Sequence, residues 1–591
     1  MHQDSDTPSV KGKNYADFSR EELIAEINKL KKTKKYGLVW EHKTEEVIEN
    51  FKNGQQPYLE EIQDKRIENA SGEPTNLIIE GDNFDALSIL NYTHAGKIDV
   101  IYIDPPYNTG SEDFIYNDSY VDENDVFRHS KWLSFMSVRL KMAKNLLREN
   151  GAIYISIDDN EQAGLKLLCD EIFGADNLVS NSIVVAAPAG TQSSTDIAQQ
   201  HAYCLIYRKS REYHAAPTML SEEELLRKYN YGEDENGRYS IERIWKRGVG
   251  GRKEDVPSLH FPVFFNPETN EILVDQEITS KNENNYIKII PYQTKGVLGR
   301  WTWSRDKMIS ERDRLVVVKI AGEYKLHKKC YAKDENGKKP FSIIPSEIGR
   351  TELGSLELKK VMGEKTFLYP KYAGFIKHLI KYSSNKNATI LDFFAGSGTT
   401  GHAVLELNKE DGGHRQFILC TNNGDKGPDS TKIAEEITYP RIKTVITGIR
   451  QDGTKYSDGI PANLRYYKIQ HEQKQPSIDA NRYTFVNHME DILKIKENAF
   501  EQVEVNEDFA LYKNSEQYLG LIFEPFSMDE IIEKLKSINV DKLDTKLYVF
   551  SYSRDAFEED YGADFNIEFK AMPEGLLKTY ANIVEELRRE D

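Results

Sequence analysis

Two short loops in the sequence carry residues whose types and spacing could hold a small ligand and a nucleobase. The first is "LDFFAGSGTT", residues 391–400, in which a short apolar run is followed by Gly396 and Gly398 and then by the start of a helix. A glycine loop lets the backbone approach a ligand closely, and a helix N-terminus offers unpaired N–H groups. The spacing is not that of dinucleotide sites, and no lysine follows the glycines as it does in a P-loop. A zwitterionic or adenosyl ligand is therefore favoured, with a glycine that only packs a helix against a strand as the alternative.

The second loop is "YIDPPYNTG", residues 102–110, at the end of another apolar run. The two prolines fix their own φ, so the carbonyl of Pro105 takes a set direction. The Asp104 carboxylate and that carbonyl could each accept one N–H of an exocyclic amino group, while Tyr107 could stack on the base that carries it. Such contacts raise the electron density on the amino nitrogen, which nucleophilic attack on a methyl sulfonium requires. A surface turn is the alternative, and the presence of both loops in one chain weighs against it.

Strands and helices alternate around these loops, to judge from the period of the apolar residues. We predict strands over 77–82, 98–104, 151–158 and 202–209, with helices over 83–93, 131–149 and 161–174 between them. The alternation resumes with helices over 372–384, 399–409 and 439–449 and strands over 388–396 and 415–421. A doubly wound α/β sheet built from two separated segments follows.

The remaining segments differ in composition, and together with the sheet they divide the chain into five predicted parts. The insert is rich in Tyr, Lys, Arg, Asn and Gly, which indicates a β-rich domain, and residues 451–591 hold 29 acidic against 17 basic side chains. A helix is predicted over 19–33, from a capping box of Ser19 and Glu22. The parts are an N-terminal helical extension (1–70), the first sheet segment (71–210), the insert (211–345), the second sheet segment (346–450) and a C-terminal acidic α+β domain (451–591).

The two loops together resemble those of the S-adenosylmethionine-dependent DNA amino-methyltransferases. Asp-Pro-Pro-Tyr upstream of Phe-x-Gly-x-Gly, with a large insert between them, is similar to their β class. Further stretches over most of residues 36–450 resemble the modification subunits of type III restriction–modification systems, namely "YGLVWE", "NLIIEGDNFDAL", "RWTWSRDKM", "FLYPKYAGFIKHLI", "ILDFFAGSGTTGHAVLELNKEDGGHRQFILCTN" and "IAEEITYPRIKTVITG". The resemblance implies a site-specific enzyme that moves a methyl group from S-adenosylmethionine to the N6 amino group of a flipped adenine in DNA.

Two alternatives stay open beside that function. The preference for adenine rests on Asp104 at the first loop position, so a cytosine-N4 methyltransferase remains possible by the same chemistry. A cytosine-C5 enzyme would need a nucleophilic cysteine, and no cysteine lies near either loop. The chain could also act chiefly as the DNA-recognition and assembly subunit of a restriction or defence complex, although intact Asp104, Tyr107, Gly396 and Gly398 weigh against lost catalysis.

The resemblance assigns roles to individual residues. The target amino group would meet the loop of Asp104, Pro105, Pro106 and Tyr107. The cofactor would be held by Asp82 near its adenine, by Lys371 closing the pocket, by Asn422 at the ribose, and by Asp392, Phe393, Ala395, Gly396, Gly398 and Thr399. Thr399 and Thr400 would also cap the helix that follows. The sequence departs from the family at Tyr372, where a proline often follows the lysine, and at Thr421 and Asn422, where many members have a ribose-binding acid.

The resemblance also implies that the insert is the target recognition domain, and its basic residues interleaved with aromatics suit contact with phosphates and bases. The residues expected to contact DNA are Arg243, Lys246, Arg247, Arg252, Lys253, Arg300 and Arg305. The alternative is a solvated charged hairpin with tryptophans in its core. The acidic C-terminal part would instead serve dimerisation or the docking of a restriction subunit that carries the helicase and nuclease.

Composition bounds these expectations. The chain has 591 residues, a net charge of -18, and no apolar run long enough to span a bilayer. Its four cysteines are scattered, so neither a zinc site nor a disulfide framework is expected. We therefore expect a cytoplasmic protein without a metal, which acts on double-stranded DNA as a homodimer and keeps its acidic excess away from the duplex.

Overall fold

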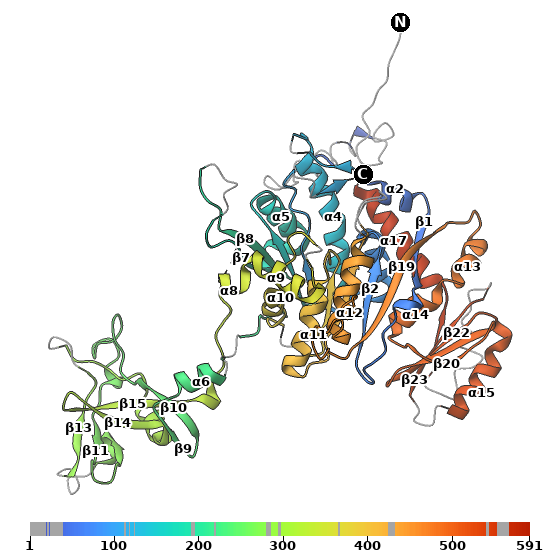
Figure 1. The fold of residues 1–591 in the computed structure, drawn as a ribbon. Coiled ribbons are helices and arrows are strands. Elements are labelled where there is room, and N and C mark those ends of the chain that lie inside the picture. The colour runs from blue at the N-terminus through green and yellow to red at the C-terminus, as the bar shows by residue number, and fades with distance from the viewer. Residues whose placement is uncertain are drawn as a thin grey trace. The chain divides into compact units, whose positions relative to one another are not determined.

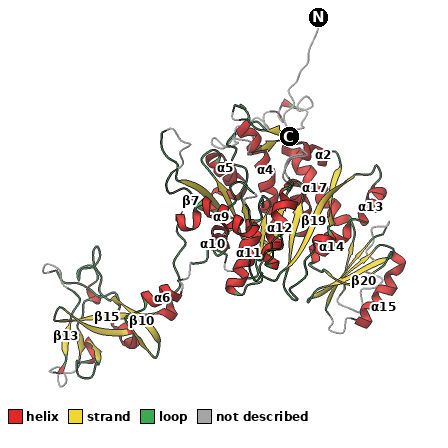
Figure 2. Ribbon diagram, in the orientation of Figure 1, coloured by secondary structure: helices red, strands yellow, loops and turns green. Residues whose placement is uncertain are grey.

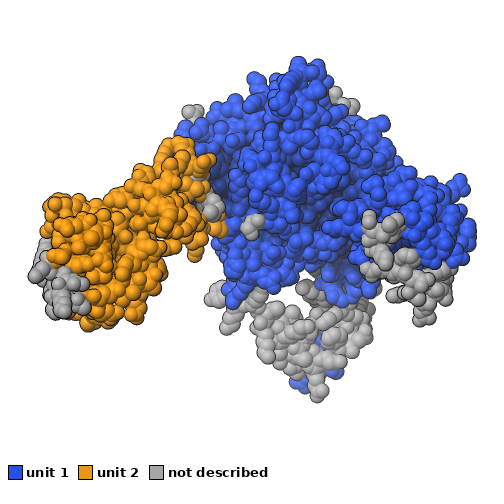
Figure 3. Space-filling view, turned by 90° about the horizontal axis from the view of Figure 1, so that it is seen from below, with its two compact units in different colours: residues 1–216, 341–591 blue, residues 217–340 orange. Residues whose placement is uncertain are grey.

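The structure, a computed structural model, divides the chain into two compact units, one of residues 1–216 and 341–591 and the other of Pro217–Pro340 (Figure 3). It describes residues 19, 20, 23 and 40–590 except 111–113, 117–118, 123, 191–195, 218–219, 221, 279–284, 293–296, 365–366, 384, 424–431, 539–542 and 552–566. The helix predicted over 19–33 therefore lies almost wholly outside the described residues. The second unit falls within the predicted insert, 211–345.

The first unit is built on a ten-stranded sheet in the order β1-β19-β2-β18-β17-β3-β6-β8-β7-β16 (Figure 1). The six strands from β19 to β6 run parallel, while β8 is antiparallel to both of its neighbours and β1 is antiparallel to β19. The predicted α/β sheet from two separated segments is confirmed, and the sheet is mixed. Its strands are β1 (Gln55–Glu61), β2 (Thr75–Glu80), β3 (Ile98–Ile103), β6 (Leu147–Ile157), β7 (Leu178–Val185), β8 (His201–Arg208), β16 (Ile343–Ile344), β17 (Thr389–Asp392), β18 (Gln416–Thr421) and β19 (Asn463–Gln473).

Helices cover both faces of this sheet, as Figure 2 shows. Successive residues of β3 alternate between two apolar cores, because side chains of a strand point to opposite faces. One core takes Ile101 and Ile103 together with α3 (Asn83–Thr93), α4 (Arg128–Leu146), α5 (Gln162–Cys169), α14 (Met489–Glu497) and α17 (Glu574–Glu590). The other takes Val100 and Tyr102 together with α9 (Thr351–Met362), α10 (Ala373–Ile380), α11 (Thr399–Asp411) and α12 (Tyr439–Thr447).

Three strands of the sheet lie outside the segments predicted for it, the short β16 at the end of the predicted insert and the longer β1 and β19. β1 belongs to the part predicted as a helical extension, where only α2 (Glu46–Lys52) is helical, and β19 follows the predicted boundary at residue 450. Both β1 and β19 carry many polar residues, and ion pairs to neighbouring strands, one buried and one at the surface, explain why these can lie in a sheet. Arg465 of β19 binds Glu61 of β1 at 2.8 Å, and Lys468 binds Glu80 of β2 at 2.9 Å.

The C-terminal region is joined to the first unit and is not a separate compact unit. It adds a five-stranded sheet in the order β20-β21-β22-β23-β24, and α17 returns to the main sheet, where the Tyr580 hydroxyl donates to the Pro57 carbonyl at 2.6 Å. A truncation at residue 450 would thus remove β19 from its place between β1 and β2 in the main sheet. The elements are α13 (Ile478–Val486), β20 (Glu501–Val505), β21 (Phe509–Lys513), β22 (Gln517–Ile522), α15 (Met528–Ile538), β23 (Asp544–Val549) and β24 (Ile567–Ala571).

The second unit is rich in short strands around a core that contains Trp245 and Trp301. One sheet has the order β14-β15-β10-β9 and the other β12-β11-β13. The elements are α6 (Glu222–Lys228), β9 (Gly232–Asp234), β10 (Gly237–Arg243), β11 (Val263–Phe265), β12 (Ile272–Val274), β13 (Ile287–Ile289), α7 (Arg305–Ser310), β14 (Leu315–Ile320) and β15 (Glu323–Tyr331). The first unit also holds the small hairpin of β4 (Ile115–Tyr116) and β5 (Ser119–Tyr120) and the short α8 (Ser346–Gly349).

Candidate active site

The two loops singled out in the sequence meet at one edge of the sheet. β3 and β17 are parallel neighbours, with Val100 opposite Ile390 and Ile101 opposite Leu391. Because the carboxyl ends of parallel strands lie at the same edge, Asp104 after β3 and Phe393 after β17 emerge side by side. Ligands of open α/β sheets bind outside this edge.

The Asp-Pro-Pro-Tyr loop is held by hydrogen bonds within itself and from α4. The Tyr107 hydroxyl donates to Asp104 Oδ1 at 2.9 Å. Burial, and then the charge of Asp104, raise the pKa of Tyr107, so its hydroxyl stays protonated. The indole N–H of Trp132, on α4, donates to the Pro106 carbonyl at 2.7 Å. Trp132 therefore fixes the carbonyl next to the one expected to face a target amino group.

A second clamp holds the residue that follows this loop. Asn108 is buried with a φ of 58°, and its Nδ2 donates to Glu161 at the start of α5. Glu161 also bonds Nδ1 of His129 at 2.6 Å, and burial raises the pKa of Glu161. Neither Trp132 nor the pair of Asn108 and Glu161 was predicted as part of the site. An Asn in a left-handed conformation directly after the loop is the feature that could have pointed to it.

Lys371 connects the two loops. Its ammonium lies 2.9 Å from Asp104 Oδ1 and donates to the Tyr107 hydroxyl at 2.7 Å. Its carbonyl accepts a hydrogen bond from Thr399 Oγ1, in the first turn of α11, at 3.2 Å. The sequence placed Lys371 at the cofactor, whereas in the structure its backbone touches the cofactor loop and its charge touches the target loop.

The glycine loop is shaped by Asp392. Gly396 and Gly398 have φ values of 47° and 76°, a region that glycine enters without strain. Asp392 Oδ1 accepts from the Phe394 N–H at 3.0 Å and Oδ2 accepts from Thr400 at 2.5 Å. The predicted capping of α11 by threonine is wrong, because Gly398 is the N-cap and the Thr400 hydroxyl turns to Asp392 instead.

Burial raises the pKa of Asp392 to about 7, which predicts a pH dependence of stability. The folded state then holds its proton more tightly than the unfolded state, so this group costs stability as pH rises from about 4 to about 7. Asp392→Asn removes that loss. We expect the difference in free energy of unfolding between the variant and the wild type to rise by a few kcal/mol in favour of the variant from about pH 4 to about pH 7. Urea denaturation at a series of pH values measures it. Asp479→Asn, at an exposed site on α13, is the control, and a gap that does not change with pH would contradict the prediction.

A buried arginine on α12 holds the glycine loop by hydrogen bonds to two of its side chains. Arg441, on α12, donates through Nη1 to Thr399 Oγ1 at 2.7 Å and to Ser397 Oγ at 3.1 Å. Its charge is balanced by Glu357 at 2.9 Å. The sequence placed Arg441 in a helix without a role, because a long-range ion pair leaves no local pattern.

The remaining residues expected at the cofactor lie around the same edge. Asp82 caps α3 by accepting from the Phe84 N–H at 2.7 Å, and its side chain is 39% exposed. Phe393 is buried, and its carbonyl accepts from Asn83 at 3.1 Å. The Asn422 carbonyl, just after β18, accepts from the Ala434 N–H at 3.3 Å. Since β2 and β18 are parallel neighbours, Asp82 and Asn422 emerge at the same edge.

The basic residues expected at DNA divide into two groups within the second unit. Arg300 donates to the Gly250 carbonyl at 2.6 Å, while Arg305 binds Asp275 at 3.0 Å and stacks over the Phe261 ring. These two guanidinium groups are engaged in holding the unit together. The others are Arg243, Lys246, Arg247 and Arg252, which are exposed, and Lys253, which is half-buried. Trp245 and Trp301 are buried in the core of the second unit. This position agrees with the alternative of a charged hairpin that has tryptophans in its core.

Comparisons with known proteins agree with the paired loops. Residues 98–425 match the DNA methylase family N6_N4_Mtase. The chain is 35% identical over 393 residues to the type III restriction-modification enzyme EcoPI Mod subunit of Escherichia phage P1, over 62% of this chain and 60% of that protein. It is 36% identical over 348 residues to the type II methyltransferase M.KpnI of Klebsiella pneumoniae, over 58% of this chain and 79% of that protein. The solved M1.HpyAVI–SAM complex is similar at 13% identity with a TM-score of 0.26, over 58% of this chain and 92% of that chain.

The match to the EcoPI Mod subunit spans less than two thirds of that protein's length. Among the described residues, no helix is both long and apolar enough to cross a membrane, and no group of His, Cys, Asp and Glu is placed to bind a metal ion.

Proposed function

The chain belongs to the DNA methylase family, and from that membership we propose that it transfers a methyl group from S-adenosylmethionine to an exocyclic amino group of a base in double-stranded DNA. The observation that carries the proposal is the meeting of the Asp-Pro-Pro-Tyr loop and the glycine loop at the ends of β3 and β17. The acceptor we propose is the N6 amino group of adenine, with the N4 amino group of cytosine as the alternative. Similarity to Mod subunits favours the modification subunit of a type III system.

The residues around the glycine loop fit S-adenosylmethionine, which supplies an electrophilic methyl group when it is bound. Gly396 and Gly398 turn the chain into α11 without a side chain at either position, so a ligand can approach the main chain at the half-buried Gly396. The part-exposed carboxylate of Asp82 can accept N–H or O–H groups. We propose that Phe393–Gly398 holds the methionine part, Asp82 the adenine and Asn422 the ribose.

The chain's own chemistry lies in the target loop. Asp104 and the Pro105 carbonyl would accept the two N–H groups of the base and hold the nitrogen lone pair toward the methyl donor. Methyl transfer puts positive charge on that nitrogen, which the Asp104 carboxylate stabilises and from which it can take the excess proton. The Lys371 ammonium, which lies 2.9 Å from Asp104, would repel the positive charge that develops on the nitrogen. The incoming base must therefore displace the ammonium from Asp104 or bind the other carboxylate oxygen. No covalent intermediate with the protein is needed.

Long-read sequencing of DNA from cells that express the protein tests this function, because it reports both the modified base and its context. We expect N6-methyladenine at one short sequence, and loss of the signal in cells expressing Asp104→Ala. N4-methylcytosine would select the alternative acceptor. An unmodified genome with the protein present and folded would contradict the proposal and favour a recognition or assembly subunit.

We propose that the exposed basic residues of the second unit bind the phosphates of the target duplex. Where affinity rests on phosphate contacts, the logarithm of the binding constant falls linearly with the logarithm of salt concentration. Arg247→Gln with Arg252→Gln should therefore reduce the slope of that plot by about 2, because two contacts are lost. Fluorescence anisotropy over a salt series measures it. Arg227→Gln with Arg238→Gln, two exposed arginines ion-paired to glutamates, is the control. An unchanged slope in the first variant would contradict the assignment.

The acidic C-terminal region remains the proposed site for protein partners. Residues 451–591 hold 29 acidic against 17 basic side chains, and this negative charge disfavours binding to DNA. Contact with a second copy of the chain or with a restriction subunit is the role we propose for them. Because β19, α17 and the five-stranded sheet all contribute to the core of the first unit, the test should reverse surface charge and not remove chain. Asp529→Lys with Glu530→Lys, at the exposed start of α15, is such a change. Changed oligomeric state with an unchanged methylated sequence is the expected result.

A further inference from the structure

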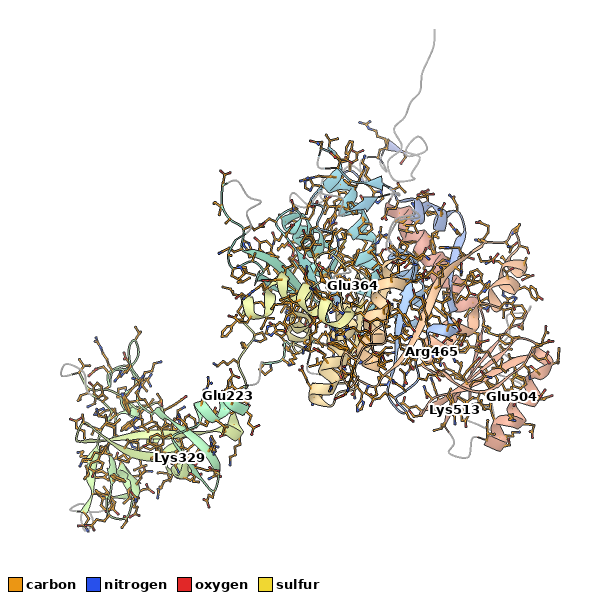
Figure 4. The ribbon with its side chains drawn as sticks, in the orientation of Figure 1. Glu223, Lys329, Glu364, Arg465, Glu504 and Lys513 are labelled. Atoms are coloured by element: carbon orange, nitrogen blue, oxygen red, sulfur yellow. The ribbon has the colours of Figure 1, made fainter. Side chains whose placement is uncertain are left out.

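A five-residue segment, Phe367–Lys371, runs from the cofactor loop to the target loop. At its start the Phe367 ring lies 3.4 Å from the position that a Cβ on Gly396 would take. At its end Lys371 touches Asp104 and Tyr107. The segment follows α9 and Glu364, which is labelled in Figure 4.

The middle of this segment presents two large apolar side chains to solvent. Leu368 is 68% exposed and Tyr369 is 75% exposed. Pro370, which follows them, is buried. Tyr369 has a φ of 54°, a left-handed conformation that a residue with a bulky side chain rarely adopts. Strain of this kind persists where surrounding contacts impose it, and it clusters at sites that act on ligands. The segment is held on both sides of Tyr369, by Phe367 against the glycine loop and by the close packing of the Pro370–Lys371 backbone on Gly354 of α9.

The reach of the chain confines these side chains to the surroundings of the site. Leu368 is one residue from Phe367 and three from Lys371, and Tyr369 is two residues from each. Their Cα atoms therefore lie no more than about 11 Å from either anchored end. Both side chains are largely exposed. An apolar pair beside the place where a base must be held outside the duplex suits contact with bases, because aromatic and aliphatic side chains replace lost stacking.

We propose that Leu368 and Tyr369 enter the DNA stack next to the target base and occupy the space that the base leaves when it turns out of the duplex. The inference rests on the proposed function. Turning a base outward costs its pairing and stacking, and that cost is smaller for a mismatched base. A side chain that fills the gap therefore matters most for a fully paired target. This dependence on pairing separates a role in base extrusion from a role in folding or cofactor binding.

The test compares methylation of two duplexes that carry the site found by sequencing, one fully paired and one mismatched at the target base. We expect Leu368→Ala with Tyr369→Gly to lose at least about tenfold in turnover on the paired duplex and to stay within about threefold of wild type on the mismatched one. Glycine at 369 keeps the left-handed backbone without the ring. Leu368→Met with Tyr369→Phe keeps the apolar bulk and should restore the paired reaction.

Two further measurements keep the inference falsifiable. 2-Aminopurine at the target position should brighten on binding of wild-type protein to the paired duplex, and should brighten less with the Ala/Gly variant. Ile478→Ala with Tyr483→Ala removes two exposed apolar side chains from α13 and should change neither readout. An equal loss on both duplexes, or no loss on the paired one, would overturn the inference and leave the proposed function standing. A wild type that methylates neither duplex would overturn both.

Discussion

Asp104→Ala is expected to abolish methyl transfer while cofactor and duplex affinities stay close to those of the wild type. The carboxylate lies at the carboxyl end of β3, where Tyr107 and Lys371 already bond one of its oxygens. A group that both orients the amino nitrogen and stabilises its developing charge is worth several kcal/mol, so turnover should fall by at least about a hundredfold. Single-turnover methylation, with calorimetry for the cofactor and anisotropy for DNA, separates these effects.

A matched control is available on the neighbouring strand. Asp159 follows β6, which is paired with β3, so its carboxylate emerges at the same edge of the sheet without belonging to the target loop. Asp159→Ala should keep turnover near the wild-type value. Turnover of Asp104→Ala within about tenfold of wild type would be too high for the role assigned to it. A parallel loss of DNA affinity would indicate instead that Asp104 serves binding.

Strands with continuous apolar runs were predictable from the sequence, whereas strands whose charges are paired across the sheet were not. β2, β3, β17 and β18 read as buried parallel strands, and each was predicted within a few residues. β19 was missed because Arg465 and Lys468 break its apolar pattern, although both are neutralised by carboxylates on neighbouring strands. A single sequence shows the charge of a residue and not its partner.

The same distinction holds at the site. The two loops could be predicted because proline, glycine and aspartate determine local geometry and chemistry within a few residues of chain. Trp132, Glu161 and Arg441 were not predicted, because each lies on a helix and reaches its loop only through the fold. Arg300 and Arg305 show the converse, since basic residues that look free in the sequence are engaged inside the second unit.

Gly396→Arg is expected to abolish cofactor binding in a protein that remains folded. Gly396 has a φ of 47°, and a Cβ there would stand 3.4 Å from the Phe367 ring, in the loop proposed to hold the methionine part. The arginine side chain must then project into the space above the loop. We expect the affinity for S-adenosylmethionine in calorimetric titration to fall at least about a hundredfold, since the loss of close backbone approach adds to steric exclusion.

The cost of a side chain in the left-handed region must be separated from exclusion of the cofactor. Gly412 closes the other end of α11 with a φ of 66° and no neighbouring atom within 4 Å of an added Cβ. Gly412→Arg thus carries a similar backbone strain, about 1 kcal/mol, on the same helix but away from the loop. It should lower thermal stability about as much as Gly396→Arg does while binding the cofactor normally. Undiminished affinity in Gly396→Arg would remove the glycine loop from the cofactor site, and equal weakening in both variants would assign the effect to the stability of α11.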